Sequence, residues 1–326
     1  MVLGTKKGKV AVLTSGGDAP GMNAAIRSVV RSALDMGYEV MGVRRGYQGL
    51  IEGDIISLDA RMVGDIMDRG GTFLKTARSM EMMTIEGQKK AANILNALNV
   101  TALVVIGGDG SIRGALTLSK YGINVVGIAG TIDLDLPCTD YTIGFDTAIN
   151  TCMESVNKIR DTSGSHERCS LVEVMGRNCG YLALWCGITG GAEEVIIPER
   201  KIPTVNELIQ IIIENRAKGK RHNLIVVAEG VGGTIELAKE IQEKTGVETR
   251  ATILGHLQRG GSPSAVDRMH ASMMGNYAIE VLEKGLKNQI VIFKDGKYSS
   301  VDIEEGLSQK HEYDDKMYSI LKSLSI

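Results

Sequence analysis

The sequence predicts an α/β protein with two Rossmann-like three-layer domains, each built on a mainly parallel sheet. Short apolar runs rich in β-branched residues recur along the chain, and glycine-rich turns followed by helical periodicity come after them. Such alternation produces parallel sheets with helices on both faces. The length of 326 residues exceeds one ordinary core, and 40 glycines with only 5 prolines suit many tight strand-to-helix turns.

The predicted strands fall into two groups, one for each sheet. The first group is Lys9–Thr14, Glu39–Val43, Ala102–Ile106 and Asn124–Ile128. The second group is Ser170–Val174, Glu194–Ile197, Asn223–Ala228 and Thr249–Leu254. Helical periodicity predicts helices between them, among others at Asn23–Leu34, Thr84–Leu98, Asn206–Ala217 and Ile235–Lys244.

Composition indicates a soluble globular protein of the cytoplasm. The 37 basic and 39 acidic residues give a net charge of −2, which favours neither a nucleic-acid nor a membrane partner. No uncharged stretch is long enough for a spanning helix. The 5 cysteines form no CxxC motif and leave one unpaired in any full disulfide scheme, so we expect free thiols in a reducing compartment.

Two glycine- and aspartate-containing stretches follow neighbouring strands of the first group. They are Gly107–Ser111, read GGDGS, and Gly130–Asp135, read GTIDLD. The interval between them matches one strand–helix–strand step, so both are expected at the same edge of a parallel sheet. Glycines that approach phosphates and carboxylates that hold magnesium or accept a proton are the parts of a phosphoryl-transfer site. The pattern therefore indicates a kinase.

Each stretch suggests particular roles. In the first, glycines leave room for nucleotide phosphates, Asp109 is a candidate Mg²⁺ ligand and Ser111 a candidate cap of the following helix. In the second, Asp133 and Asp135 stand two residues apart, so one can accept a proton while the other faces the metal or the transferring group. A glycine turn with a capped helix, or a solvated acidic turn, would show the same letters.

Another glycine-rich loop, Leu13–Asn23, joins the first strand to a helix. Its backbone N–H groups and the helix N-terminus suit a phosphate, although the loop lacks both the Walker A ending and GxGxxG. Basic residues at strand ends of the second half suit capture of a phosphomonoester, and Glu229 suits a sugar hydroxyl. These basic residues are Arg168, Arg177, Arg250, His256 and Arg259.

The chain resembles the bacterial ATP-dependent 6-phosphofructokinase family. The motifs that carry the resemblance run in the family's order over nearly the whole chain: Leu13–Arg27 (LTSGGDAPGMNAAIR), Val104–Ser111 (VVIGGDGS), Gly130–Asp135 (GTIDxD), Thr139–Ala148 (TDYTIGFDTA), Ile159–Arg168 (IRDTSGSHER), Glu173–Arg177 (EVMGR), Glu248–Pro263 (ETRATILGHLQRGGSP) and Asp267–Gly275. The resemblance implies the phosphofructokinase fold. It also implies an ATP-binding domain at residues 1–144 plus 257–308 and a fructose 6-phosphate-binding domain at 145–256 plus 309–326.

The resemblance further implies a homotetramer that transfers the γ-phosphoryl of MgATP to the 1-hydroxyl of fructose 6-phosphate in glycolysis. Its catalytic residues would be Asp133 as the base, Arg177, Thr131 and Asp135. MgATP would be held by Gly17, Arg78, Ser79, Gly108, Asp109, Gly110 and Ser111, with Asp109 serving the metal. Fructose 6-phosphate would be held by Thr131, Asp133, Arg168, Met175, Gly176, Arg177, Glu229, Arg250, His256 and Arg259, of which Arg168 and Arg250 would reach in from a neighbouring subunit.

An effector site for ADP or phosphoenolpyruvate is implied as well. Its matching residues are Arg27, Arg31, Arg160, Gly191, Glu193, Lys218, Lys220 and His222. Asp54 departs from the pattern, since some members have arginine there. Because a carboxylate repels an anion, we expect weaker or altered regulation.

Two departures lie near the predicted catalytic aspartates. Leu134 stands where the family usually has asparagine, and Cys138 stands where glycine is usual. The loss of one amide hydrogen bond costs about 1 kcal/mol. A positive φ at Cys138 would add backbone strain of roughly 1–3 kcal/mol. Slowed turnover is therefore expected, since all three carboxylates survive.

Alternative functions remain open at this point. One is a pyrophosphate-dependent phosphofructokinase, whose members tend to have Asp at position 110 and Lys at position 130, where this chain has glycines. A second is a binding paralogue weakened by Leu134 and Cys138. A third is a dinucleotide-binding oxidoreductase, which the α/β pattern alone suggests and the missing GxGxxG disfavours.

Overall fold

The computed structural model describes residues 7–310, 313 and 315–325. The chain divides into two compact units. The first unit consists of Met1–Thr131, Leu136–Thr147 and Arg259–His311, and the second of Ile132–Asp135, Ala148–Gln258 and Glu312–Ile326. The chain therefore passes between the units several times. The short segment Ile132–Asp135 groups with the second unit, whereas the sequence-based boundaries placed it within 1–144.

Within its described part, the first unit is built on a seven-stranded sheet of order β11-β10-β5-β4-β1-β2-β3. The strands are β1 (Lys9–Thr14), β2 (Glu39–Val43), β3 (Ile55–Leu58), β4 (Val100–Gly107), β5 (Asn124–Ala129), β10 (Gln289–Lys294) and β11 (Lys297–Asp302). Strands β2, β1, β4, β5 and β10 pair in parallel, while β3 and β11 add antiparallel edges.

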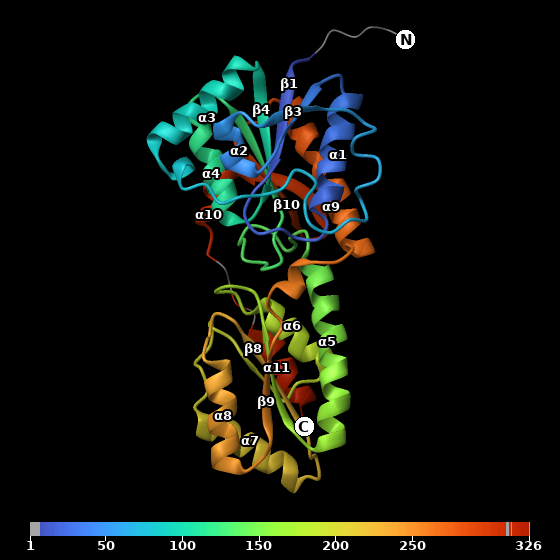
Figure 1. The fold of residues 1–326 in the computed structure, drawn as a ribbon, viewed down its shortest axis with the longest axis vertical. Helices are drawn as coiled ribbons and strands as arrows, with labels where there is room; N and C mark the ends of the chain where they lie inside the picture. The colour runs from blue at the N-terminus through green and yellow to red at the C-terminus, as the bar shows by residue number, and fades with distance from the viewer. Residues whose placement is uncertain (1–6, 311–312, 314, 326) are drawn as a thin grey trace. The chain divides into compact units, whose positions relative to one another are not determined.

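Helices cover both faces of this sheet (Figure 1). One layer contains α1 (Met22–Asp35) and α9 (Ala265–Glu283), which pack against each other. The other layer contains α2 (Gly46–Glu52), α3 (Ile85–Ala97), α4 (Asp109–Ser119) and α10 (Ile303–Ser308), next to the short helix η1 (Glu81–Met83). Strand residues such as Leu103 and Val105 are fully buried between the layers, as expected for central parallel strands.

The described residues of the second unit form a four-stranded parallel sheet of order β7-β8-β6-β9. Its strands are β6 (Cys169–Val174), β7 (Glu194–Ile196), β8 (Asn223–Ala228) and β9 (Thr249–Ile253). Helix α6 (Tyr181–Gly190) packs on this sheet and on α11 (Asp315–Leu324), while α7 (Val205–Ala217) packs on α8 (Thr234–Thr245). Helix α5 (Phe145–His166) starts in the first unit, and η2 (Gly255–Arg259) ends the second unit's middle segment.

The predicted fold class and both strand groups are confirmed, with differences of one or two residues at strand ends. The hairpin of β10 and β11 was not predicted, although the Asp-Gly pair between its strands indicates a turn. Asp295 and Gly296 connect its strands with φ values of 51° and 74°. An Asp-Gly pair with positive φ at both residues is the preferred two-residue hairpin turn.

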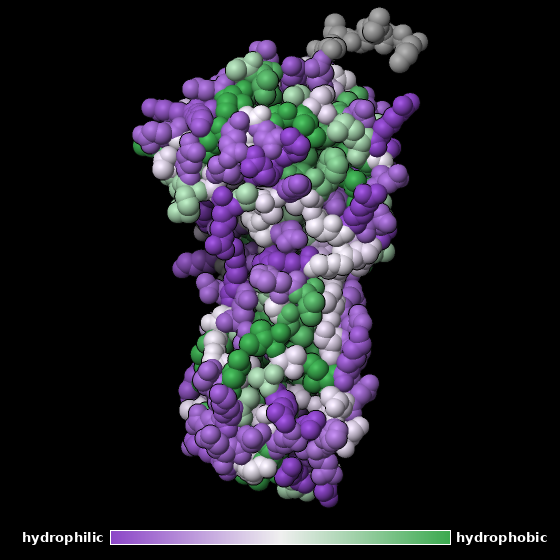
Figure 2. All heavy atoms as spheres, in the orientation of Figure 1, coloured by the Kyte–Doolittle hydropathy of each residue, from purple (hydrophilic) through white to green (hydrophobic). Residues whose placement is uncertain are grey.

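The visible surface carries both hydrophilic and hydrophobic residues. Figure 2 shows mostly hydrophilic residues on the visible face, with hydrophobic ones in smaller areas. Among the described helices, none combines the length and apolar character needed to cross a membrane.

All 5 cysteines are buried and unbridged, so each packs as a small apolar side chain.

Candidate functional site

Two glycine loops lie side by side at the carboxyl edge of the first unit's sheet. Strands β1 and β4 are parallel neighbours, and the N–H of Ser15 donates to the carbonyl of Ile106 at 3.1 Å. A Cβ atom at Gly107 would lie 2.5 Å from the carbonyl oxygen of Ser15, so only glycine permits this approach. The Gly130 N–H donates to the carbonyl of Gly107 at 3.0 Å, so the Gly130–Asp135 stretch begins at the same edge.

Helix α4 begins at Asp109, with Gly108 as its N-cap residue. The prediction that Ser111 caps this helix is wrong, because the helix starts two residues earlier and Ser111 already lies in its first turn. The carboxylate of Asp109 accepts Nε–H of Arg113 at 2.8 and 3.0 Å, and its side chain is 34% exposed. A carboxylate in the first turn also interacts favourably with the helix dipole.

Asp109 fits the requirements of a magnesium ion that is bound together with a nucleotide. Mg²⁺ prefers oxygen ligands and is usually held by one or two carboxylates plus substrate phosphates. Asp109 supplies one accessible carboxylate beside glycines that leave room for phosphates, since a Cβ at Gly110 would meet no heavy atom within 4 Å. Among the described residues, no cluster of three or more His, Cys, Asp or Glu side chains forms an all-protein metal cage.

The other predicted nucleotide-binding residues lie in the first unit too. Gly17 faces the guanidinium of Arg259, whose Nη1 donates to the Asp18 carbonyl at 3.2 Å. Arg78 is exposed in the segment before η1, and the Ser79 hydroxyl accepts the Met82 N–H at 3.3 Å. Arg259, predicted for the sugar phosphate, therefore contacts the β1 loop in this structure. Sequence spacing gave no sign of this contact.

The acidic pair belongs to the second unit. The Asp133 side chain is 3% exposed, and its Oδ2 lies 3.6 Å from Nε of Arg177. Asp135 Oδ2 lies 4.0 Å from Nη1 of the same guanidinium. Arg177 itself is 61% exposed, so its cationic end is accessible while it faces both carboxylates. Thr131 precedes this segment in the first unit and is buried close to Gly108.

The turn after β6 positions Arg177. Gly176 has a φ of 129°, and a Cβ there would lie 2.4 Å from the Cys179 carbonyl oxygen, so glycine is required at this point. Arg177 follows with a φ of 54°, and its backbone N–H donates to Oε1 of Glu229 at 2.8 Å. Glu229 lies directly after β8. Met175, Arg177 and Glu229 are thus gathered at the carboxyl ends of two parallel strands.

Arg168 and Arg250 are joined by Glu248, a residue that sequence reasoning assigned no role. Arg168 Nε lies 2.8 Å from Glu248 Oε2, and Arg250 Nη2 lies 2.6 Å from Oε1. Hydrogen bonds from Arg168 and then from Arg250 lower the pKa of Glu248, which keeps the carboxylate ionised. One carboxylate therefore holds two cationic side chains together. The predicted partner His256 is exposed on η2.

Backbone strain lies at Leu134 rather than at Cys138. Leu134 has a φ of 52°, in the left-handed region, whereas Cys138 is absent from the positive-φ residues of the described chain. The condition on which strain at Cys138 was expected, a positive φ, is therefore not met. The Cys138 side chain instead packs against Gly306 of α10, and burial raises the pKa of its thiol. The asparagine usual at position 134 tolerates the left-handed conformation better than leucine does.

The predicted effector residues are divided between the units. In the second unit, Arg160 Nη1 donates to the Gly190 carbonyl at 2.5 Å, and Lys220 forms an ion pair with the buried Glu193. Lys218 ends α7, and His222 directly precedes β8. In the first unit, Arg27 and Arg31 lie one turn apart on α1, and Arg31 donates to the Ala60 carbonyl at 3.1 Å.

Asp54 is held by two arginines of the first unit. Its carboxylate accepts Nε–H of Arg44 at 2.7 Å and Nε–H of Arg45 at 3.2 Å. Desolvation alone would raise the pKa of Asp54, but the hydrogen bonds from Arg44 and Arg45 lower it on balance. The charge that was expected to repel an anion is thus partly neutralised by its neighbours.

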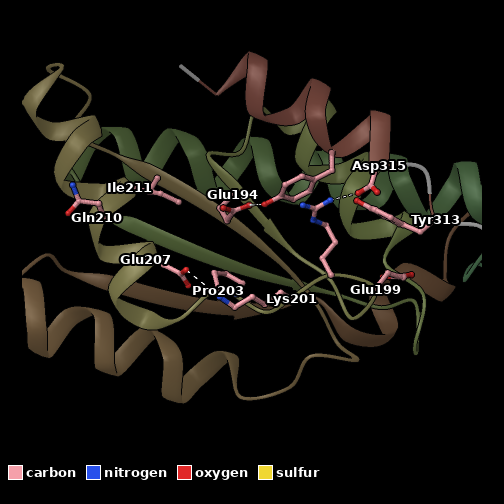
Figure 3. A pocket seen from close by; sticks show the side chains of 11 residues that line it. Glu194, Glu199, Lys201, Pro203, Glu207, Gln210, Ile211, Tyr313 and Asp315 are labelled. Atoms are coloured by element: carbon pink, nitrogen blue, oxygen red, sulfur yellow. Dashed lines mark hydrogen bonds and ion pairs between the residues drawn. The ribbon is translucent and has the colours of Figure 1, made fainter.

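A separate pocket of about 700 Å³ lies within the second unit, between α7, α11 and the segment after β7 (Figure 3). Its lining combines acidic, basic and tyrosine side chains, including Glu199, Lys201, Glu207, Tyr313 and Asp315. None of the predicted site residues contributes to this lining.

Comparison with known proteins decides the family. The profile of the phosphofructokinase family matches residues 9–282, most of the chain. The chain belongs to the phosphofructokinase family. A relative from Clostridium botulinum strain Hall, described as ATP-dependent 6-phosphofructokinase, is 57% identical over 97% of this chain and 99% of its own length. A Clostridium perfringens relative, described as ATP-dependent 6-phosphofructokinase 1, is 57% identical over the same shares of both chains.

Solved structures of the phosphofructokinase family share this fold. The Saccharomyces cerevisiae phosphofructokinase matches with a TM-score of 0.86 and 35% identity, covering 98% of this chain and 48% of the yeast chain. This chain thus spans about half the length of the yeast protein. A pyrophosphate-dependent phosphofructokinase from Marinobacter aquaeolei matches with a TM-score of 0.83 at 19% identity, over 97% of this chain and 91% of its own. At that identity the likeness concerns the fold alone.

Proposed function

We propose that this protein is an ATP-dependent 6-phosphofructokinase of glycolysis. It transfers the γ-phosphoryl group of ATP to the 1-hydroxyl of D-fructose 6-phosphate and releases fructose 1,6-bisphosphate and ADP. The observation that carries the proposal is the buried Asp133 carboxylate beside the accessible Arg177 guanidinium, a proton acceptor next to a cation for the transferring group. The 57% identical relatives named for this activity match 97% of the chain and support it.

The residues divide into three roles. Asp133 accepts the proton of the 1-hydroxyl, Arg177 and Thr131 stabilise the charge of the transferring phosphoryl group, and Asp135 orients Arg177. The glycine loops and α4 hold ATP through Gly17, Arg78, Ser79, Gly108, Gly110 and Ser111, and Asp109 would hold Mg²⁺. The magnesium ion, when bound, neutralises phosphate charge. Fructose 6-phosphate contacts Met175, Gly176 and Glu229 at the sugar and Arg168, Arg250, His256 and Arg259 at the phosphate.

Glycine at position 110 supports ATP over pyrophosphate as the donor. A Cβ at Gly110 would meet no heavy atom of the described residues within 4 Å, which supports room for a nucleotide phosphate at this position. An aspartate at this position, as the pyrophosphate-dependent members tend to have, would extend a negative charge into the same space. Electrostatic repulsion between that carboxylate and the α-phosphate would oppose ATP binding.

A coupled assay with two donors tests the function. Purified protein is supplied with fructose 6-phosphate and either MgATP or Mg-pyrophosphate, and formation of fructose 1,6-bisphosphate is followed. Turnover with MgATP alone is the expected result. Turnover with pyrophosphate alone would overturn the choice of donor. Nucleotide binding without turnover would identify a binding paralogue instead.

Leu134→Asn is expected to raise kcat. The left-handed backbone conformation costs a leucine roughly 1–2 kcal/mol, and asparagine relieves most of this strain. Each 1.4 kcal/mol is a factor of about ten in rate if the strain displaces the adjacent catalytic aspartates. Leu134→Gly is the matched control, because it removes the strain without adding an amide. An unchanged or lower kcat for Leu134→Asn in the coupled assay would contradict the hypothesis.

We also propose that the enzyme is a cytoplasmic homotetramer regulated by ADP or phosphoenolpyruvate. The cationic side chains of Arg160 and Lys220 in the second unit, and the exposed Arg31 in the first, support an anionic effector site. Light scattering coupled to gel filtration measures the assembly. A mass of one chain or two would contradict the tetramer.

Asp54→Arg is expected to strengthen the response to both effectors. The substitution replaces a carboxylate by a guanidinium beside Arg44 and Arg45, so an anionic effector would meet more positive charge. The measurement is the shift of half-saturation for fructose 6-phosphate on addition of each effector. Asp54→Asn removes the negative charge alone and should give an intermediate shift. A strong response in the wild type that Asp54→Arg leaves unchanged would contradict this expectation.

A further inference from the structure

Gln258 is a fully buried polar residue in a segment of sequence that carries predicted substrate ligands. Its side chain is 0% exposed and belongs to the short helix η2 (Gly255–Arg259), between His256 and Arg259. A buried primary amide has to place its carbonyl oxygen and its NH₂ group against partners. The hydrogen-bond partners of Gln258 show which segments its side chain connects.

The carbonyl oxygen of Gln258 accepts two hydrogen bonds. One comes from the backbone N–H of Met175 at 3.1 Å, and the other from the thiol of Cys152 at 3.1 Å. The amide nitrogen donates to the carbonyl of Gly255 at 3.0 Å. Met175 follows β6, Cys152 belongs to α5, and Gly255 begins η2. One side chain thus ties three segments of the second unit together.

The tie between Met175 and η2 matters most for the substrate. Met175 is followed by Gly176 and Arg177, whose turn faces the acidic pair, while η2 presents the exposed His256. Met175 is itself buried, at 7% exposed. The Gln258 amide therefore fixes the β6 turn relative to the loop that carries the histidine.

We propose that Gln258 is a positioning residue for fructose 6-phosphate. It acts through the Met175 N–H and the Gly255 carbonyl and keeps the sugar-binding turn and the phosphate-binding histidine at a fixed separation. The inference rests on the proposed function, because that function assigns both segments to fructose 6-phosphate. Substrate-binding residues that are already held in place lose less entropy when the substrate binds. Loss of the Gln258 amide should therefore weaken fructose 6-phosphate binding more than it changes turnover.

The test compares Gln258→Met with Gln258→Glu. Methionine keeps the length and apolar volume of the side chain but makes none of the three hydrogen bonds, whereas glutamate keeps an acceptor for the Met175 N–H. We expect Gln258→Met to raise the KM for fructose 6-phosphate about tenfold, with kcat and the KM for MgATP within about threefold of wild type. Gln258→Glu should fall between Gln258→Met and the wild type. A Gln258→Met enzyme whose two KM values are both unchanged, or rise together, overturns the proposal.

A control in the same unit separates positioning from stability. Tyr318 of α11 donates a hydrogen bond to the buried Glu194 of β7 at 2.6 Å, and Tyr318→Phe removes it. The Tyr318→Phe variant should have a lower melting temperature and unchanged KM values for both substrates. A selective rise of its KM for fructose 6-phosphate would overturn the specific role of Gln258. Wild-type turnover with MgATP distinguishes the two levels: its absence refutes the proposed function, while its presence with normal Gln258 variants refutes the positioning role alone.

Discussion

Replacing Asp133 with asparagine is expected to lower kcat for phosphoryl transfer by about a thousandfold, the middle of the range for loss of a general base. The Asp133 carboxylate is nearly inaccessible to solvent and faces Arg177 across 3.6 Å. An asparagine has almost the same size, so packing is preserved, but its amide cannot accept the proton of the attacking hydroxyl. The coupled assay measures the loss, and substrate titrations measure binding separately.

Binding should survive this substitution. The KM values for both substrates are expected to stay within a few-fold of wild type, because the proposed phosphate and nucleotide ligands are unchanged. Asp140→Asn is the matched control: Asp140 is an exposed aspartate a few residues further along the chain, outside the proposed machinery. A residual rate in Asp133→Asn within tenfold of the wild type would show that another group takes the proton.

The sequence allowed prediction of the elements that repeat a simple pattern. Buried strands such as Lys9–Thr14 and Asn223–Ala228 read as continuous apolar runs, because both faces of a parallel sheet are covered by helices. The meeting of the GGDGS and GTID glycines at one edge followed from the same rule, since the carboxyl ends of parallel strands share an edge. Period and chain direction were sufficient for these features.

Other features depend on contacts between residues distant in the chain. Glu248 joins Arg168 to Arg250 only because β9 pairs with β6, and the burial of Gln258 depends on where η2 meets the end of β6. The left-handed φ of Leu134 arises in a segment that groups with the second unit while its neighbours belong to the first. No local pattern of residue types encodes such pairings. Sequence reasoning therefore found candidate ligands but not the residues that hold them.

A second large effect is expected at Asp267, where a structural carboxylate is buried. Asp267 is 0% exposed and accepts hydrogen bonds from the Tyr141 hydroxyl at 2.7 Å, the Gly144 N–H at 2.6 Å, and the N–H and hydroxyl of Thr147 at 2.8 and 2.5 Å. Burial raises the pKa of this carboxyl, and the hydrogen bonds oppose that rise. Both the start of α5 and the start of α9 are thereby fixed to one side chain.

Asp267→Ala leaves these donors without their acceptor. Asp267→Asn is also unfavourable: each carboxylate oxygen accepts one backbone N–H, so in either orientation the amide NH₂ group faces such a donor. Each unsatisfied buried donor costs about 1–3 kcal/mol, so we expect Asp267→Ala to lose roughly 4 kcal/mol or more of stability. At about 2–4 °C per kcal/mol, the melting temperature should fall by roughly 10 °C in scanning calorimetry. Tyr141→Phe, which removes one donor and leaves the carboxylate with the others, should lower it by only a few degrees. Equal melting temperatures for Asp267→Ala and Tyr141→Phe would mean that water or another group replaces the lost acceptor, and that the carboxylate does not hold the two helix starts together.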